Sequence, residues 1–537
     1  MALKRPEIPS IGEADRTPLV ESLLAVIEQQ HAQLLQMQEQ IEVLKDEISR
    51  LKGHKGKPKV PPSRLEGGRG GGGEGKGNRG RNKKPKLPKL EIHDTQIVKA
   101  DNVPKGSTFK GYSNYTVVGL RFEPYNVRYR VQVWYTPDGQ RLTGEIPGVV
   151  KAAGGHFSYD LVAFIHYQHH HGLVPQHLIC EQLQDIGVSI SEGTVNNILL
   201  DCKEQFHREK AEILRVGLQV SSQIHVDDTG ARHNGRNGVC THIGNDLFAY
   251  FESTESKSRI NFLKLLRAGR TDYILDAEAL SYMDSQKMPK YLLEVIRAHG
   301  EATFEDESAW QALLMSLGIT GKRHAQIATE GALFASVLSG DINPALAIIS
   351  DDAGQFNVLR HALCWIHAER TLHKLVGISD EQTKALEAKR LEVWDFYRRL
   401  KLYKEAPTVE LKMELDRQFD VIFLEKTCFV GLNLALKRLH ANKSELLLVL
   451  ERPDIDLHNN LSEGDIREYV TRRKRNGSTR SDQGRRCRDT FTSLKKTCRK
   501  LGISFWQYLR DRFSGSNTIP QLSEIIAQRA QEAPQQA

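Results

Sequence analysis

The sequence predicts a multidomain protein of mixed structure, of the α+β or α/β class, with an N-terminal coiled coil, a small β module and a central region of short strands and helices. At 537 residues the chain is too long for a single hydrophobic core. The three parts are indicated by a heptad pattern near the N-terminus, alternating apolar residues after residue 90, and short apolar runs that end in acidic residues further on.

Residues 19–52 carry the heptad pattern. Apolar side chains follow one another in alternating steps of four and three, interrupted by Gln30, at Leu23, Ile27, Leu34, Met37, Ile41, Leu44, Ile48 and Leu51. About four heptads suffice for a short coiled coil, and a polar core position such as Gln30 could fix its register. We predict a homodimer or higher homo-oligomer formed through this segment; the alternative is an amphipathic helix packed on its own domain.

Positive charge is concentrated in two segments. The net charge is +8, to which residues 52–89 contribute +11 and residues 467–500 contribute +10, so the rest of the chain carries −13. Residues 53–90 are mainly Gly, Lys, Arg and Pro and predict a flexible basic linker. Local basic segments of this kind are typical of proteins that neutralise phosphates. Solvated basic tails are the alternative interpretation.

The cysteine pattern and the apolar runs indicate the compartment. The seven cysteines form no CxxC pair, so we expect neither structural zinc nor a disulfide framework. No apolar run approaches the roughly 18 residues that a membrane-spanning helix needs. We therefore predict a reduced, cytoplasmic protein without a membrane partner.

Residues 91–150 predict the small β module. Apolar residues alternate over Val127–Trp134, with Val127, Tyr129, Val131 and Val133 on one face, and a turn at Pro137-Asp138-Gly139 precedes a second short strand. The absence of cysteine from residues 91–147 means that the module would have to fold through its own apolar contacts.

Residues 151–217 predict helices. A helix over Leu173–Leu183, a turn at Gly187 and a second helix entered through Ser191 have the spacing of a helix-turn-helix. Such a pair could read DNA bases or could be a plain packing motif. Upstream, we do not expect His169–His171 to bind a metal ion, because consecutive residues of a helix point to different faces, and we interpret them as a polar surface run.

Three acidic residues lie where strands end or a helix begins. Gln223–Asp228 predicts a strand, followed by two antiparallel strands over Gly238–Gly244 and Leu247–Ser253. Strand alternation places Asp227 and Asp228 on opposite faces, and we select Asp227 as the residue that faces the site.

The second acid comes after a predicted strand, whereas the third lies near the start of a predicted helix. The apolar run Ala345–Ser350 predicts a buried strand that delivers Asp351, with Asp352 beside it, to the strand's end. Glu463 opens a predicted helix that Asp456 or Asn459 could cap. Carboxylates arranged in this way suit two Mg²⁺ or Mn²⁺ ions that promote in-line attack at a phosphodiester, so we predict Asp227, Asp351 and Glu463 as catalytic and metal-binding residues and nucleic acid as the substrate.

Further side chains are expected around these acids. A predicted helix over His361–Arg370 places His367 and Arg370 on one face, near the acids or a phosphate; the alternative is that Trp365 and His367 only pack the helix. With Asp228 and Asp352, they form the predicted surroundings of the site. The predicted DNA-binding residues are Arg467, Arg472, Arg473, Lys474, Arg475, Arg480 and Arg485.

Several motifs resemble the insertion sequence 66 family of bacterial transposases. The similar blocks, in the family's order, are His225-Val-Asp227-Asp-Thr229, Asp351–Asn357 with Cys364–Arg370, Asn459–Glu463, and the later Ile466-Arg467, Arg473-Lys474, Ser481–Gly484 and Tyr508–Asp511. The resemblance implies a ribonuclease H-like core, the triad Asp227, Asp351 and Glu463, DNA cleavage at element ends and strand transfer into a target. It also implies accessory proteins from the same element and a nucleoid-associated location.

The sequence departs from that family in two respects. The family's cysteine zinc module has no counterpart here, and Asp227 and Asp351 are 124 positions apart, a long separation. We predict an added helical subdomain at about residues 262–342, inside a catalytic domain over 218–475 that precedes a basic helical region over 476–537. Two other functions stay open: a nuclease of the same fold that does not join DNA, and an inactive DNA-binding repressor.

Overall fold

The computed structural model describes four single residues near the N-terminus and most of the chain from residue 92 on: residues 17, 20, 26, 30, 92–99, 104–114, 116–146, 148 and 156–532. The chain divides into two compact units, residues 1–41 with 123–537, and residues 42–122. The predicted coiled coil and basic linker lie outside the described residues, apart from three isolated positions. Both stay predictions.

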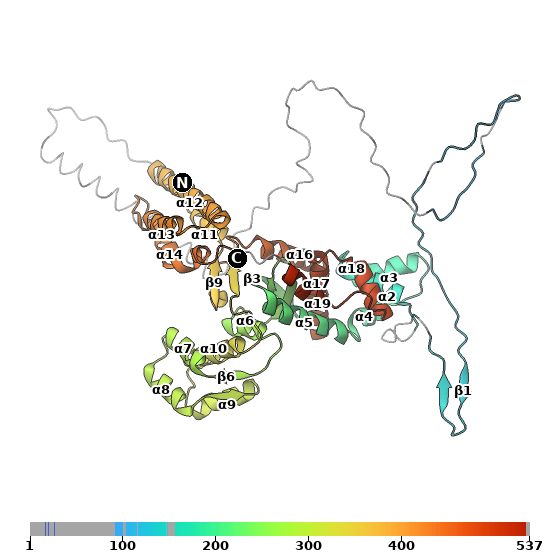
Figure 1. Cartoon of the computed structure of the whole chain (residues 1–537), viewed down its shortest axis with the longest axis horizontal. Coiled ribbons are helices and arrows are strands. Elements are labelled where there is room, and N and C mark those ends of the chain that lie inside the picture. Colours follow the sequence, from blue (N-terminus) through green and yellow to red (C-terminus); the bar gives the residue numbers. More distant parts are fainter. Residues whose placement is uncertain are drawn as a thin grey trace. The chain divides into compact units, whose positions relative to one another are not determined.

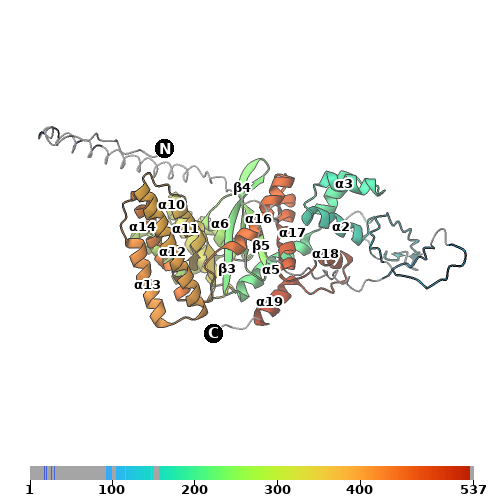
Figure 2. The ribbon, with the colours of Figure 1, turned by 90° about the horizontal axis from the view of Figure 1, so that it is seen from above.

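A five-stranded mixed sheet forms the centre of the larger unit (Figure 2). Its order is β5-β4-β3-β8-β9, with bounds β3 (Gln223–His233), β4 (Arg236–Gly244), β5 (Ala249–Thr254), β8 (Ala347–Ser350) and β9 (Arg360–Leu363). β3, β4 and β5 are antiparallel, which confirms the three predicted strands, whereas β8 and β9 run parallel to β3. β3 extends beyond its predicted end to a tight hairpin at Asn234 and Gly235, both with positive φ.

Apolar side chains cover both faces of this sheet. Ile224, Val226 and Ile348 belong to the main core, with helices α5 (Glu204–Val220), α6 (Arg259–Leu266) and α10 (Lys322–Leu338). Ala347 and Ile349 belong to a second core, with the helices α11 (Trp365–His373), α12 (Asp380–Glu405), α13 (Val409–Leu424), α14 (Val430–Ala441) and α15 (Lys443–Leu446). Burial on both faces explains why β8 reads as one continuous apolar run.

The C-terminal helices follow the sheet in sequence, and the second of them covers its β5 edge. They are α16 (Asn460–Asn476), α17 (Asp482–Lys500), α18 (Phe505–Ser514) and α19 (Leu522–Glu532). Alternate backbone N–H groups of β5, those of Ala249, Phe251 and Ser253, donate to side chains of α17, namely Thr497, Ser493 and Asp489. These N–H groups of the edge strand are therefore bonded to a helix and are not exposed for pairing with a strand of another chain.

The predicted helical region before the sheet is confirmed as α2 (Tyr159–His170), α3 (Gln176–Asp185) and α4 (Glu192–Leu200). Ser191 caps α4 by accepting from the N–H of Thr194, and Gly187 turns the chain with φ of 89°. The prediction of a histidine surface run is wrong for His170, which is buried and stacks on Phe491 of α17. His170 belongs to a group of aromatic side chains that packs α2 against the C-terminal helices.

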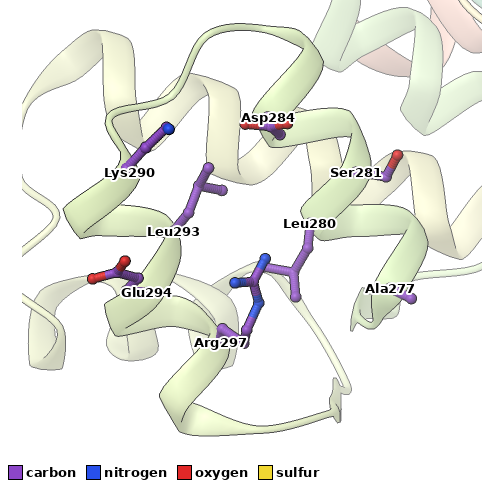
Figure 3. Close-up of a pocket in the computed structure, with 8 residues that line it drawn as sticks. All are labelled: Ala277, Leu280, Ser281, Asp284, Lys290, Leu293, Glu294 and Arg297. Carbon is purple, nitrogen blue, oxygen red and sulfur yellow. The ribbon is translucent and has the colours of Figure 1, made fainter.

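Residues 262–342 form a small α+β layer beside the sheet (Figure 1). The helices expected in this segment are present and include α7 (Ala277–Ser285), α8 (Lys290–His299) and α9 (Glu307–Ser316). A two-stranded sheet of β6 (Tyr273–Leu275) and β7 (Ala302–Phe304) was not predicted, because each strand has only three residues. A pocket of about 450 Å³ lies between α7 and α8 (Figure 3) and contains none of the predicted site residues.

Of the predicted β module, the described residues show only the hairpin. β1 (Val133–Tyr135) and β2 (Arg141–Thr143) pair around the predicted turn, where Gly139 has φ of 82°. Val127, Tyr129 and Val131 lie outside the strand, and they are exposed together with Val133. A module with its own apolar core is therefore not observed in the described residues, because no second layer covers this face.

In the described part of the chain, no helix has the length and apolar character needed to cross a membrane.

Candidate active site

The sheet register brings the first two predicted acids level. β3 and β8 pair in parallel with His225 opposite Ile349, and two residues further along each strand come Asp227 and Asp351. Because side chains alternate with a period of two, the two acids follow residues of the same face. Asp227 lies within β3, whereas Asp351 lies one residue beyond the end of β8.

Asp228 is buried and faces away from Asp227. Its carboxylate accepts from the Thr241 hydroxyl at 2.6 Å and from the Gln355 amide at 2.8 Å. Burial raises the pKa of Asp228 above its usual value, and the charge of Asp351 adds to the rise. Asp228 is thus close to the site, but its two carboxylate oxygens already accept hydrogen bonds from uncharged side chains. This supports Asp227 over Asp228 as the predicted site residue.

Asp351 and its neighbour Asp352 have different surroundings. The Oδ1 atom of Asp351 is buried and has no hydrogen-bond partner in the described structure. Asp352 is instead bound by Arg438 at 2.6 Å and Asn442 at 3.3 Å, both from the helical region after α11. A buried carboxylate oxygen without a partner costs free energy unless another ligand binds it, so Asp351 is the better candidate for a cation.

Glu463 lies in the first turn of α16, which packs against β3 and β4. The predicted N-cap position is confirmed at Asn459, but its side chain makes no capping hydrogen bond. Two further residues of α16 bind one histidine of β4: Ser462 Oγ lies 2.7 Å from His242 Nδ1, and Asp465 Oδ2 lies 3.2 Å from its Nε2. Glu463 is therefore presented from a helix turn fixed to the sheet.

The segment before α11 was predicted wrongly as helix. His361–Leu363 belongs to strand β9, and the helix begins at Trp365, because parallel pairing with β8 extends to Ser350 opposite Leu363. Trp365 is buried and donates to the Leu446 carbonyl, so it has the packing role of the alternative interpretation.

His367 and Arg370 of α11 both contact Glu463. Arg370 Nη1 donates to Glu463 Oε1 at 2.9 Å, and His367 Nε2 lies 3.3 Å from the same oxygen. Burial lowers the pKa of His367, although the charges of Glu463 and Asp351 act in the opposite direction. The predicted shared face of the two residues is therefore directed at the third acid.

Among the described residues, no group of three or more His, Cys, Asp or Glu side chains is arranged to hold a metal ion. The observed pairing of Glu463 with Arg370 is one physical reason, since this carboxylate is occupied by a cation of the protein. The donor types still fit hard divalent ions, which prefer carboxylate oxygens, and the unpartnered Oδ1 of Asp351 is available.

The predicted DNA-binding cations differ in exposure. Arg467, Lys474, Arg475 and Arg480 are exposed. The prediction for Arg472 is wrong: it is 4% exposed and donates to Thr492 and His170.

The other two predicted cations have protein partners. Arg473 is half-buried and binds the Gly230 carbonyl, whereas Arg485 pairs with Asp482. Four of the seven predicted cations are thus exposed without a described ion-pair partner.

Two acidic residues of α16 explain why several basic residues nearby are buried. Asp465 contacts Lys500 at 2.8 Å and Lys496 at 3.5 Å, and Glu468 contacts Lys495 and Lys496. Although burial alone would raise it, the pKa of Asp465 is held well below its usual range by His242 and Lys500. Much of the predicted basic segment therefore joins α16 to α17.

Comparison with known proteins gives the family. Residues 154–261 and 337–486 match the sequence profile described as Transposase IS66 family. The chain is also 42% identical over 321 residues to the uncharacterized protein y4jO of Sinorhizobium fredii (strain NBRC 101917 / NGR234), covering 59% of this chain and all of that protein. The chain belongs to the IS66 family of transposases.

The two matched blocks contain all three predicted acids and the α11 residues that contact Glu463. The residues between the blocks, 262–336, include α7, α8, α9 and both strands of the small sheet. The sequence interpretation missed His242 as a side chain that fixes the Glu463 helix. For His242 the only available signal was its position, fifteen residues after Asp227 on an adjacent strand.

Proposed function

We propose that this chain is a DNA transposase in which Asp227, Asp351 and Glu463 hold two divalent metal ions, cleave DNA at the ends of a bacterial insertion sequence and join it to target DNA. The observation that carries the proposal is the parallel register of β3 and β8, which sets Asp227 level with Asp351 at the face where α16 presents Glu463. The mixed sheet order supports a ribonuclease H-like core.

The side chains around the acids support specific roles. Mg²⁺ or Mn²⁺, when bound, would supply positive charge for the attacking and leaving oxygens. Asp227 and Asp351 would hold the ions from the sheet, and Glu463 would complete the site from the helix. Arg370 is 45% exposed, so it can turn from Glu463 to a phosphate oxygen of DNA and leave the carboxylate free for an ion.

DNA binding is proposed for the exposed end of α16 and the residues after it. Lys474, Arg475 and Arg480 lie at the surface beyond the buried network, and Arg467 lies one turn from Glu463. Contacts of this type neutralise phosphates without reading bases, so affinity should fall steeply as salt rises.

The experiment is cleavage and joining of a labelled DNA duplex that carries the inverted repeat flanking the coding region. The natural protein and Asp227→Ala are compared in Mg²⁺ and in EDTA. We expect metal-dependent cleavage and joined products from the natural protein and neither from the variant.

Other results separate the alternatives. Cleavage without joined products would indicate a nuclease, and tight binding without chemistry by either protein would indicate a repressor or a missing accessory protein. Activity that survives Asp227→Ala would contradict the assigned triad.

A synaptic role for residues 19–52 is proposed from the heptad pattern alone. A coiled coil would pair two subunits so that two element ends are held together, which transposition requires and simple cleavage does not. Deletion of residues 1–52 should preserve binding of one DNA end and impair pairing of two ends in a gel-shift assay. Unchanged pairing would contradict this role.

A further inference from the structure

A single buried asparagine contacts the surroundings of all three acids. Asn459 is 0% exposed and precedes the first residue of α16. Asparagine at an N-cap normally accepts from a backbone N–H of the first helical turn. Here the side chain makes no capping bond, so its amide is directed elsewhere.

The side-chain amide binds the strand that carries Asp227. Nδ2 of Asn459 donates to the Val226 carbonyl at 2.8 Å, and Oδ1 lies 3.2 Å from Nδ1 of His225. Val226 is the residue directly before Asp227. The amide therefore fixes the backbone from which the first acid projects.

The backbone of Asn459 reaches the other two acids. Its N–H donates to Sγ of Cys364 at 3.2 Å, and the N–H of Cys364 donates to the Ser350 carbonyl at 2.9 Å, directly before Asp351. The carbonyl of Asn459 accepts from the N–H of Glu463 at 3.2 Å. One residue thus connects the three segments that present the acids.

We propose that Asn459 is a positioning residue that sets the spacing of Asp227, Asp351 and Glu463 and thereby their affinity for divalent metal ions. This inference rests on the proposed function of the triad. The side chain must donate to the Val226 carbonyl, and the amide nitrogen of asparagine does so. A carboxylate of the same shape would place an acceptor against the Val226 carbonyl.

The test uses Asn459→Asp, with Asn433→Asp as the matched control. Asn433 also donates its side-chain amide to a backbone carbonyl, that of Thr427 at 2.9 Å, but it lies on α14 and contacts none of the three acidic segments. The first readout is the rise in melting temperature produced by Mn²⁺ alone, which reports metal affinity without activity. The second is the Mg²⁺ concentration that gives half-maximal cleavage of the labelled DNA end.

We expect Asn459→Asp to weaken Mn²⁺ binding and raise the Mg²⁺ requirement by roughly 10- to 100-fold, as loss of a residue that orients metal ligands does. Binding of DNA in EDTA should be retained. Asn433→Asp should lower the melting temperature without changing either metal dependence. Equal metal dependence in Asn459→Asp and the natural protein would overturn the inference, as would an equal change in the control.

Two further results distinguish failure of this inference from failure of the variant to fold and from failure of the proposed function. If Asn459→Asp does not fold, His225→Gln removes the ring that lies between Oδ1 of Asn459 and Oδ2 of Asp456. It should raise the Mg²⁺ requirement in the same direction by a smaller factor. An unchanged requirement there would overturn the inference. If the natural protein shows neither Mn²⁺ stabilisation nor cleavage, the proposed triad itself fails.

Discussion

The first and last turns of α16 differ in what they contact. The first two turns are fixed to the sheet and to α11: Ser462 and Asp465 contact His242 of β4, and Glu463 contacts Arg370 of α11. The last turn exposes Lys474 and Arg475, for which no ion pair is described. One helix therefore combines a fixed end suited to chemistry with a charged end suited to a phosphate backbone.

The difference shows that net charge in a sequence segment does not by itself locate a binding surface. The segment 467–500 is strongly basic, yet Arg472, Arg488, Lys495 and Lys496 are buried. Lys495 and Lys496 contact Glu468, Arg472 donates to the Thr492 hydroxyl, and Arg488 donates to the Gly477 carbonyl. The following predictions test whether the two ends have separate roles.

Replacement of Glu463 by Gln should have the largest effect. The variant keeps the shape of the side chain and removes the negative charge that would hold an ion. We expect cleavage to fall by about 10³-fold, equivalent to several kcal/mol of transition-state stabilisation, while DNA binding in EDTA stays within about threefold. Single-turnover cleavage and gel-shift titration check this; a parallel loss of binding would contradict separate roles for the two ends.

Replacement of Asp465 by Ala should destabilise the fold. It leaves Lys500 and His242 without this carboxylate in a buried setting and Lys496 with Glu468 alone, which costs about 3 kcal/mol. Urea unfolding measures the loss. The control is Asp482→Ala, whose 83% exposed side chain pairs with Arg485 and should change the free energy of unfolding by about 0.5 kcal/mol or less. Equal losses would show that Asp465 is not structurally special.

The buried His170, which contacts Arg472 of α16, should make the stability of the fold sensitive to acid. Burial, Arg472 and Lys495 hold the pKa of His170 well below 6.5, with neighbouring histidines adding to the shift. The unfolded chain takes up a proton near pH 6.5 that the folded chain does not, so stability falls as pH decreases below that value.

We expect a loss of roughly 2 kcal/mol from His170 between pH 6.5 and 5, measured by urea unfolding. His170→Gln keeps an acceptor for Arg472 and should flatten this dependence. An unchanged pH dependence in the variant would assign the effect to other groups.

Replacement of Lys474 and Arg475 by Ala should have the smallest effect, confined to DNA affinity. If both contact phosphates, the slope of log affinity against log salt should decrease in magnitude by about 1.8, and cleavage at saturating DNA should not change. The control is Arg486→Ala, an exposed arginine already paired with Glu204. An unchanged slope would place the DNA elsewhere.

Four of the five strands of the sheet could be predicted from sequence because each depends on a local pattern. Apolar runs ending in Asp227 and Asp351 predicted both strands, and Ser191 correctly predicted the start of α4. The strand over Arg360–Leu363 was missed because four residues carry too little periodicity to distinguish a buried strand from a helix.

Features that depend on distant partners could not be predicted. The exposure of Arg472 is decided by His170 and Thr492, which are far away or on the next helix. The connecting role of Asn459 depends on Val226 and Cys364, each at least 95 residues earlier. Asn459 was expected as an ordinary helix cap, because a sequence shows the residue type but not where its amide is directed.

The most direct test of the account is the location of divalent ions in crystals of the protein bound to a DNA end, determined from the anomalous scattering of Mn²⁺. We expect metal peaks within bonding distance of Asp227, Asp351 and Glu463, with Arg370 turned away from Glu463 toward a phosphate. Ions bound instead at Asp228 or Asp352, or bound while Glu463 stays paired with Arg370, would contradict it.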